Sequence, residues 1–182
     1  YAYDRRLIEE RVILLRQVLP PELELHYAVK ANPMPAVVQH LSRLINGLDV
    51  ASLGELTVAL DAGMDPAEIS FAGPGKRPPE LAAAIAAGVT INLESAGELE
   101  TVARLGQARQ PRVAVRVNPD FELKASGMKM GGGPKPFGVD AEQVPALLRR
   151  ISELELDFRG FHIFCGSQNL RHEALIDAHD RT

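Results

Sequence analysis

The sequence lacks several features that would assign it to a particular class of protein. It has a single cysteine, Cys165, which excludes an internal disulfide and leads us to expect a reducing, cytoplasmic compartment. No apolar run approaches the roughly 18–20 residues that a membrane-spanning helix needs, so we expect no membrane association. The net charge is −4, without a basic excess, and this argues against nucleic acid as a partner.

Motifs for metal and nucleotide binding are also missing. The five histidines have no metal-ligand spacing, so no metal site is predicted. The glycine-rich stretch "GMKMGGGPKPFG" (127–138) lacks the trailing Lys-Ser/Thr of a P-loop, and we interpret it as a mobile flap. The expected first strand is followed by "KANPMP" rather than by the glycine fingerprint of a dinucleotide-binding fold.

Strand and helix patterns alternate along the chain. The 182 residues are 46% hydrophobic and 24% charged, an ordinary globular composition that is sufficient for one domain with a core. Each expected strand is a short apolar or alternating run, and a helical pattern follows it. The expected strands cover residues 23–30, 47–52, 68–73, 89–94, 111–119 and 156–167.

This alternation predicts the α/β class with parallel strands. An open doubly wound sheet and a parallel (β/α)₈ TIM-type barrel both satisfy it. We favour the barrel, because the polar residues fall at the carboxyl ends of the strands, where barrels carry their chemistry. Only six βα units are present, so the chain is expected to be a piece of a longer protein whose last two barrel strands lie elsewhere.

Lys30 ends the first expected strand, in "HYAVKANP" (26–33). Apolar walls at a barrel mouth would lower the pKa of its amine and leave a neutral fraction able to attack a carbonyl. That chemistry serves either an aldolase or an imine with pyridoxal phosphate. An ordinary exposed lysine at a strand edge explains the pattern equally well.

Three more charged residues lie in or just after the expected strands. Asp49 and then Glu55 lie in "LDVASLGEL", where a carboxylate could orient the lysine, although Glu55 also has the spacing of a helix-capping partner to Ser52. Arg116 lies in "VAVRVNP", and an inward orientation would require Asp49 or a cofactor beside it. An outward, solvated arginine remains the alternative.

The last expected strand carries "FHIFCGSQ" (161–168). His162 and Phe164 share one strand face, because side chains alternate along a strand. The Gly166-Ser167 turn that follows offers an amide and a hydroxyl suited to a phosphate. A lone histidine is more often structural than catalytic, and such turns are common.

Seven motifs together resemble one known family in order and spacing. The chain resembles the fold-type III pyridoxal 5'-phosphate-dependent decarboxylases, the group of diaminopimelate and ornithine decarboxylases related to alanine racemase. The wording "FAGPGK" and "FHIFCGSQN" resembles the branch associated with exosortase A systems. The seven motifs are "YAVKANP", "GLDVASLGEL", "ISFAGPGK", "INLESAGEL", "VRVNPDF", "PFGVD" and "GFHIFCGSQ".

The resemblance implies a role for several residues. Lys30 would form the Schiff base with the cofactor, and Asp49 and Glu55 would lie near that lysine. Arg116 would lie near the cofactor ring, and Ser167 at its phosphate. Phe164 falls where the family has a ring-stacking histidine, and it can stack but cannot offer a proton. His162, two residues earlier on the same face, is the candidate that would partly replace that histidine.

The resemblance also implies the activity and assembly of the whole protein. It implies decarboxylation of an amino acid, with residues 1–182 as part of the pyridoxal phosphate barrel and a C-terminal β-domain beyond them. It implies a homodimer when the protein is full length, and an inactive fragment in isolation. A single-barrel carrier of pyridoxal phosphate, an amino-acid racemase and a cofactor-free aldolase remain alternatives.

Overall fold

A computed structural model of the chain describes residues 2–118, 136–164, 166 and 171–181. Three features that the sequence singled out, Cys165, Ser167 and the larger part of the glycine-rich loop, lie outside the described residues. The part of the loop that is described, residues 136–138, leads directly into a short strand.

The described strands form one seven-stranded parallel sheet. All six predicted strands are present, although the first is confined to three residues. A two-residue strand, β6, was not predicted, because the glycine-rich segment before it has no strand pattern. The strands are β1 (His26–Ala28), β2 (Gly47–Val50), β3 (Ile69–Phe71), β4 (Thr90–Leu93), β5 (Arg112–Asn118), β6 (Val139–Asp140) and β7 (Asp157–Ile163).

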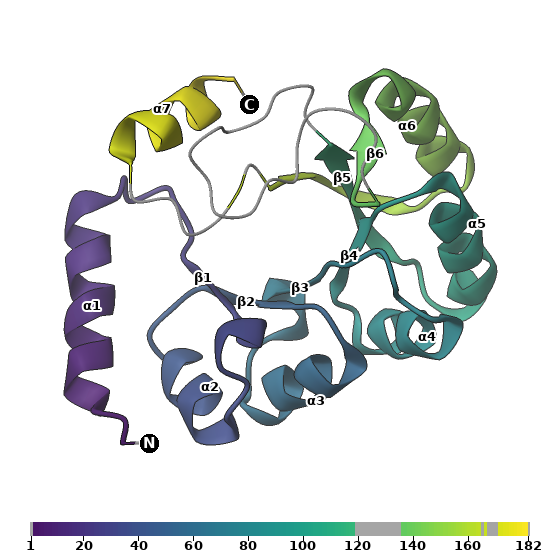
Figure 1. Ribbon diagram of the computed structural model, residues 1–182. Helices are drawn as coiled ribbons and strands as arrows, with labels where there is room; N and C mark the ends of the chain where they lie inside the picture. The colour runs from purple at the N-terminus through teal and green to yellow at the C-terminus, as the bar shows by residue number, and fades with distance from the viewer. Residues whose placement is uncertain (1, 119–135, 165, 167–170, 182) are drawn as a thin grey trace.

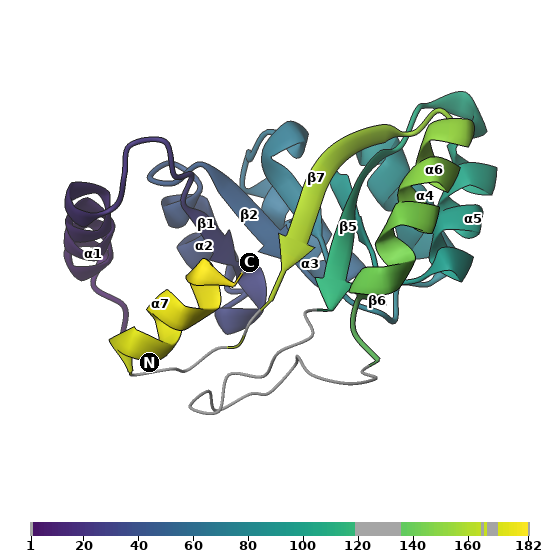
Figure 2. The same cartoon turned by 90° about the horizontal axis from the view of Figure 1, so that it is seen from above.

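Strand order decides between the two candidate architectures. Strands β1 to β5 pair in chain order, and β7 pairs with β5, so the order does not reverse as it does in a doubly wound sheet. Figure 1 shows the sheet as an arc with helices α2 to α6 along its outer side. Figure 2 shows β5 and β7 running in the same direction. The sheet is therefore the wall of a βα barrel, as predicted, and the doubly wound alternative is wrong.

Serine side chains cap two of the helices. Ser52 Oγ accepts a hydrogen bond from Glu55 N–H at 3.2 Å, which confirms the predicted cap, and Ser95 Oγ accepts one from Glu98 N–H at 3.1 Å. No helix among the described residues is long and apolar enough to span a membrane. The helices are α1 (Arg5–Val18), α2 (Pro35–Leu41), α3 (Leu53–Asp61), α4 (Pro78–Ala87), α5 (Ala96–Leu105), α6 (Val144–Glu153) and α7 (His172–Asp180).

The two faces of the sheet have opposite chemistry. Alternate strand residues that face the helices are apolar and pack into one continuous core, whereas their neighbours on the inner side are mainly polar. The apolar strand residues are Leu48, Val50, Ile69, Phe71, Ile91, Leu93, Val113 and Val115. The polar strand residues are His26, Asp49, Ser70, Thr90, Asn92, Arg112, Arg116 and His162. Any ligand of this barrel therefore meets polar groups on its inner side.

Gly47 provides a test of this packing. A Cβ at Gly47 would overlap the backbone carbonyl of Glu68 and the ring of His26, and the backbone cannot yield cheaply. We expect Gly47→Ala to lower the free energy of unfolding of the intact protein by about 1–3 kcal/mol, because overpacking strains the core. Gly75→Ala is the matched control, since a Cβ there meets nothing within 4 Å. Denaturant unfolding measures both, and equal stabilities would contradict the packing.

Candidate active site

Four of the predicted site residues, Lys30, Arg116, His162 and Phe164, lie toward the carboxyl ends of the strands. Lys30 follows β1 on a single 3₁₀ turn, Val29–Ala31, and Arg116 lies near the end of β5. His162 lies in β7 in register with Arg116, so these two side chains stand next to each other. Parallel strands end on one side of the sheet, which explains why residues so distant in sequence converge.

Lys30 and Arg116 both approach the ring of Phe164. The distance to the ring centroid is 5.7 Å from Lys30 Nζ and 5.7 Å from Arg116 Cζ. Phe137 covers Arg116 as well, at 5.0 Å from its ring centroid to Cζ. Attraction between a cation and an aromatic face operates at this range. An amine and a guanidinium thus share one aromatic ring.

Lys30 is exposed, so the described residues do not form the apolar shelter that was predicted around it. The reason is its place in the sheet. Strand β1 lies at the edge, and of the described strands β2 alone pairs with it. One side of Lys30 therefore faces the gap that the remaining strands of a closed barrel would fill.

Arg116 points inward and is buried, with 7% of its surface exposed. Its Nη1 donates to both carboxylate oxygens of Glu94, at 3.0 and 3.1 Å. We predicted Asp49 or a cofactor beside an inward Arg116; the carboxylate that pairs with it is Glu94 rather than Asp49, and a cofactor beside it stays a prediction. Glu94 directly follows β4, the strand next to β5, whereas Asp49 lies in β2.

Glu94 is held by two loops in addition to Arg116. Its carboxylate accepts hydrogen bonds from Gly73 N–H and from Gly138 N–H, the latter at 3.3 Å. Gly138 has φ +78°, and a Cβ there would meet Arg116 O at 3.0 Å, so glycine is needed for this approach. The Glu94 carboxylate therefore joins β4 to the segments beside β3, β5 and β6.

Asp49 lies deeper in the barrel than Lys30. Its Cα is paired with Ala28, two residues before Lys30, and its carboxylate accepts from Ser70 Oγ at 2.6 Å and contacts His26 Nδ1 at 3.4 Å. Burial alone would raise the pKa of Asp49, but the hydrogen bonds from His26 and Ser70 outweigh burial and lower it. The role of Asp49 toward the cofactor stays a prediction, while Glu55 accepts from Ala51 N–H at 2.8 Å as a capping residue.

His162 is the one imidazole at this level of the site. Its Nδ1 is buried and has no hydrogen-bond partner within the described residues. Burial lowers the pKa of His162, and the nearby positive charge of Arg116 lowers it further. A neutral imidazole with an unsatisfied nitrogen is thus directed into the barrel.

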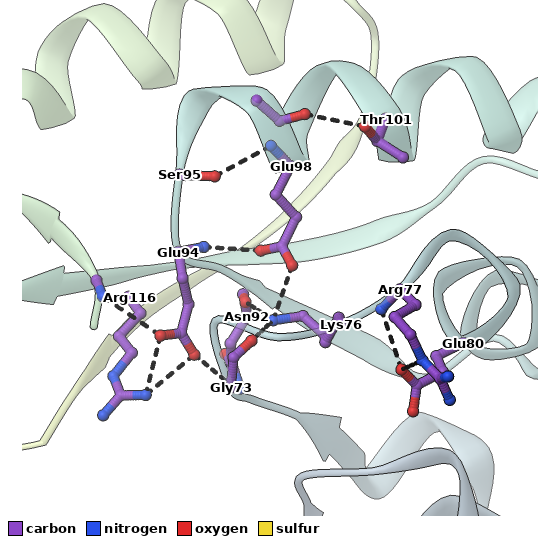
Figure 3. Close-up of polar contacts among 12 residues, drawn as sticks. Gly73, Lys76, Arg77, Glu80, Asn92, Glu94, Ser95, Glu98, Thr101 and Arg116 are labelled. Carbon is purple, nitrogen blue, oxygen red and sulfur yellow. Dashed lines mark hydrogen bonds and ion pairs between the residues drawn. The ribbon is translucent and has the colours of Figure 1, made fainter. Parts of the chain in front are cut away.

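Sequence analysis missed a buried ionic cluster behind Arg116, drawn in Figure 3. Lys76 Nζ lies 3.0 Å from Glu98 Oε1, and Glu98 Oε2 accepts from Glu94 N–H at 2.8 Å. Burial raises the pKa of Glu98, although the charge of Lys76 opposes the rise. Glu94 lies two residues beyond Asn92, so the alternation along β4 was the signal that could have revealed it.

One group of potential metal ligands occurs among the described residues, at the opposite ends of the strands. Ligand atoms of Glu24, His26 and Glu68 lie within 4.8 Å of one another. Their separation in sequence explains why no ligand spacing was visible. Glu24 and Glu68 precede β1 and β3, so the group lies at the amino ends of these strands, whereas Lys30 follows the carboxyl end of β1.

The two inner histidines should titrate on opposite sides of the ordinary value of 6.5. The hydrogen bond to Asp49 raises the pKa of His26 against the opposing effect of burial, whereas burial lowers that of His162. Histidine NMR titration of the intact apoprotein, with His26→Gln and His162→Gln for assignment, measures both. Coincident midpoints would contradict this electrostatic arrangement.

Comparison with known proteins places the chain in a family. The chain is 35% identical over 186 residues to an L-glutamyl-[BtrI acyl-carrier protein] decarboxylase of Niallia circulans, covering 98% of this chain and 42% of the relative. It is 38% identical over 177 residues to a diaminopimelate decarboxylase of Aquifex aeolicus, covering 93% of this chain and 41% of the relative. The chain thus spans less than half the length of these curated relatives.

A solved structure has the same fold. The diaminopimelate decarboxylase of Helicobacter pylori complexed with L-lysine superimposes with a TM-score of 0.86 and 28% identity, over 97% of this chain and 46% of that one. Residues 5–182 match the family described as pyridoxal-dependent decarboxylase, pyridoxal binding domain. The chain belongs to this family of pyridoxal-dependent decarboxylases, and the match covers their pyridoxal binding domain.

Proposed function

We propose that the intact protein carrying this chain is a pyridoxal 5'-phosphate-dependent amino-acid decarboxylase, a carboxy-lyase. The observation that carries the proposal is the approach of Lys30 and Arg116 to the ring of Phe164, each at 5.7 Å, at the carboxyl ends of β1 and β5. Family membership supports the reaction class, since the relatives and the structure named above are decarboxylases.

The residues present fit pyridoxal phosphate. A primary amine, a guanidinium and an aromatic face converge, and the buried Nδ1 of His162 lacks a partner among the described residues, as expected where a polar ligand enters. When bound, this cofactor withdraws the electron pair that departing CO₂ leaves on the substrate α-carbon.

Five residues are proposed to bind the cofactor. Lys30 would hold it covalently as a Schiff base, because its amine is the primary amine that follows β1 at the mouth. Arg116 would contribute positive charge beside the ring, with its orientation set by Glu94, and Phe164 an apolar face for stacking. Ser167, outside the described residues, is proposed for the phosphate. Asp49 is the fifth residue: it lies deeper in the barrel than Lys30 and would act through its negative charge.

His162 is proposed as the catalytic imidazole of this centre. Its lowered pKa keeps it neutral near pH 7, so its ring can accept a proton from the substrate amine or relay one through Nδ1. Phe164 cannot exchange protons at all. The adjacent His162, in register with Arg116, is the nearest replacement on β7.

The proposal for the rest of the protein rests on the unpaired edges of the sheet and on the share of its relatives' length that the chain covers. We infer that residues 1–182 are part of the barrel domain, and that further βα units close it between β7 and β1. Phe158 and Phe161 of β7 are 39% and 55% exposed, as expected of side chains on which another helix or strand packs in the intact protein. A C-terminal β-domain, a homodimer and a cytoplasmic location complete the proposal.

The substrate is proposed as an amino acid, with diamino acids as the first to assay because diaminopimelate decarboxylases recur among the relatives. The decarboxylase names of the relatives favour this reaction over a carrier or a racemase. The branch associated with exosortase A systems stays a prediction.

Lys30→Ala should abolish covalent cofactor binding in the intact protein. Borohydride reduction of the holoenzyme followed by peptide mass spectrometry should find the pyridoxyl group on Lys30 of the wild type alone. CO₂ release from diaminopimelate, lysine and ornithine should be lost in parallel, because the substrate amine can no longer displace a lysine.

Lys30→Arg is the matched control, because it keeps the positive charge near Phe164 but cannot condense with an aldehyde. It should behave as Lys30→Ala does. Modification of another lysine in the wild type, or turnover by either variant, would refute the assignment.

His162→Gln should separate chemistry from binding. We expect kcat to fall by about 10²–10⁴-fold, the range for loss of a general acid–base group, while cofactor affinity changes little. The low-pH limb of the kcat profile should disappear with the imidazole. An unchanged kcat would leave His162 without a catalytic role.

A further inference from the structure

Lys76 is a buried ammonium group that the proposed chemistry does not use. Its side chain is 1% exposed, on the turn between β3 and α4. Its Nζ donates to Glu98 Oε1 at 3.0 Å, to Asn92 O at 3.0 Å and to Gly73 O. Burying an ammonium is costly even when it is paired, so its placement calls for an explanation.

The contacts of this ion pair converge on Glu94 from two directions. Glu98 Oε2 accepts the backbone N–H of Glu94 at 2.8 Å. Lys76 holds the carbonyl of Gly73, whose own N–H donates to the Glu94 carboxylate. Figure 3 shows the Lys76–Glu98 pair beside Glu94, with Arg116 on the other side of that carboxylate. Hydrogen bonds thus connect both the backbone and the carboxylate of Glu94 to one ion pair, the carboxylate through Gly73.

We propose that Lys76 and Glu98 are positioning residues that, through Gly73 and Glu94, set where the Arg116 guanidinium lies relative to the cofactor. The inference rests on the proposed function, because it assigns a purpose to the placement of Arg116. Lys76 and Glu98 act through Glu94 and Gly73, without touching Arg116 in any contact described above.

Charge balance makes the proposal testable. Lys76 and Arg116 contribute two positive charges, and Glu94 and Glu98 two negative ones. The double variant Lys76→Met/Glu98→Gln removes one charge of each sign, so no buried charge is left uncompensated. The glutamine carbonyl can still accept Glu94 N–H. The variant loses the hydrogen bonds that Lys76 donates to the carbonyls of Gly73 and Asn92.

A second ion pair, next to Lys76 in the sequence, provides a control. Arg77 Nε pairs with Glu80 Oε2 at 3.1 Å, one residue along from Lys76, and Glu80 also accepts from Leu53 N–H. Figure 3 shows this pair apart from Glu94 and Arg116. Arg77→Met therefore removes a neighbouring ion pair that none of the contacts described here joins to Arg116.

The experiment measures the position of Arg116 and the affinity for the cofactor in the intact protein. In the apoprotein, the Arg116 Nε–H NMR resonance should shift in the double variant and stay in place in Arg77→Met. Titration of both apoproteins with pyridoxal phosphate should give a dissociation constant raised about tenfold in the double variant alone, since small misplacements of a site group are costly. The KM for the amino acid should be unchanged.

Each outcome of this experiment either supports or overturns the inference. A folded double variant with wild-type resonance and affinity overturns the inference, as does an equal loss in Arg77→Met. If the double variant does not fold, Lys76→Met alone is used, because burial already raises the pKa of Glu98 and lets this side chain become neutral without its partner. The same shift and loss of affinity are expected, and no change overturns the inference. A wild-type protein that binds no pyridoxal phosphate overturns the proposed function and this inference with it.

Discussion

The buried ion pair between Arg116 and Glu94 is the interaction on which the site depends. A guanidinium that is 7% exposed is stable only when a carboxylate compensates it, and removing one partner of such a pair costs about 3–5 kcal/mol. Glu94 supplies that charge and also accepts from the backbone of Gly73 and Gly138. One carboxylate therefore fixes the ends of neighbouring strands and the orientation of the cation that faces Phe164.

The sheet makes this arrangement possible because its two faces differ. Apolar side chains fill the space between the strands and the helices, and their burial stabilises the barrel wall. The inner residues are then free to be polar, whereas many βα barrels pack their bore with bulky apolar side chains. Strand register places Arg116 next to His162, and no loop has to bring them together.

The inner charges are arranged in two levels. His26 and Asp49 pair below, where a hydrogen bond favours the charged form of both. Arg116 and His162 lie above, where burial and a neighbouring cation keep the imidazole neutral. Because the two levels are separate, Asp49 and His26 form a hydrogen bond with each other. The imidazole of His162 is left available to a ligand.

The sequence alone determined the βα alternation, the parallel sheet, the helix caps and the placement of Lys30 and Arg116 at strand ends, because these follow from local periodicity and turn chemistry. Tertiary structure alone decided that Glu94, 22 residues from Arg116, is its partner, and that Lys76 and Glu98 lie behind it. It also decided that Lys30 is exposed at the sheet edge. Pairing between strands determines which side chains meet at one height, and that pairing is a property of the assembled sheet.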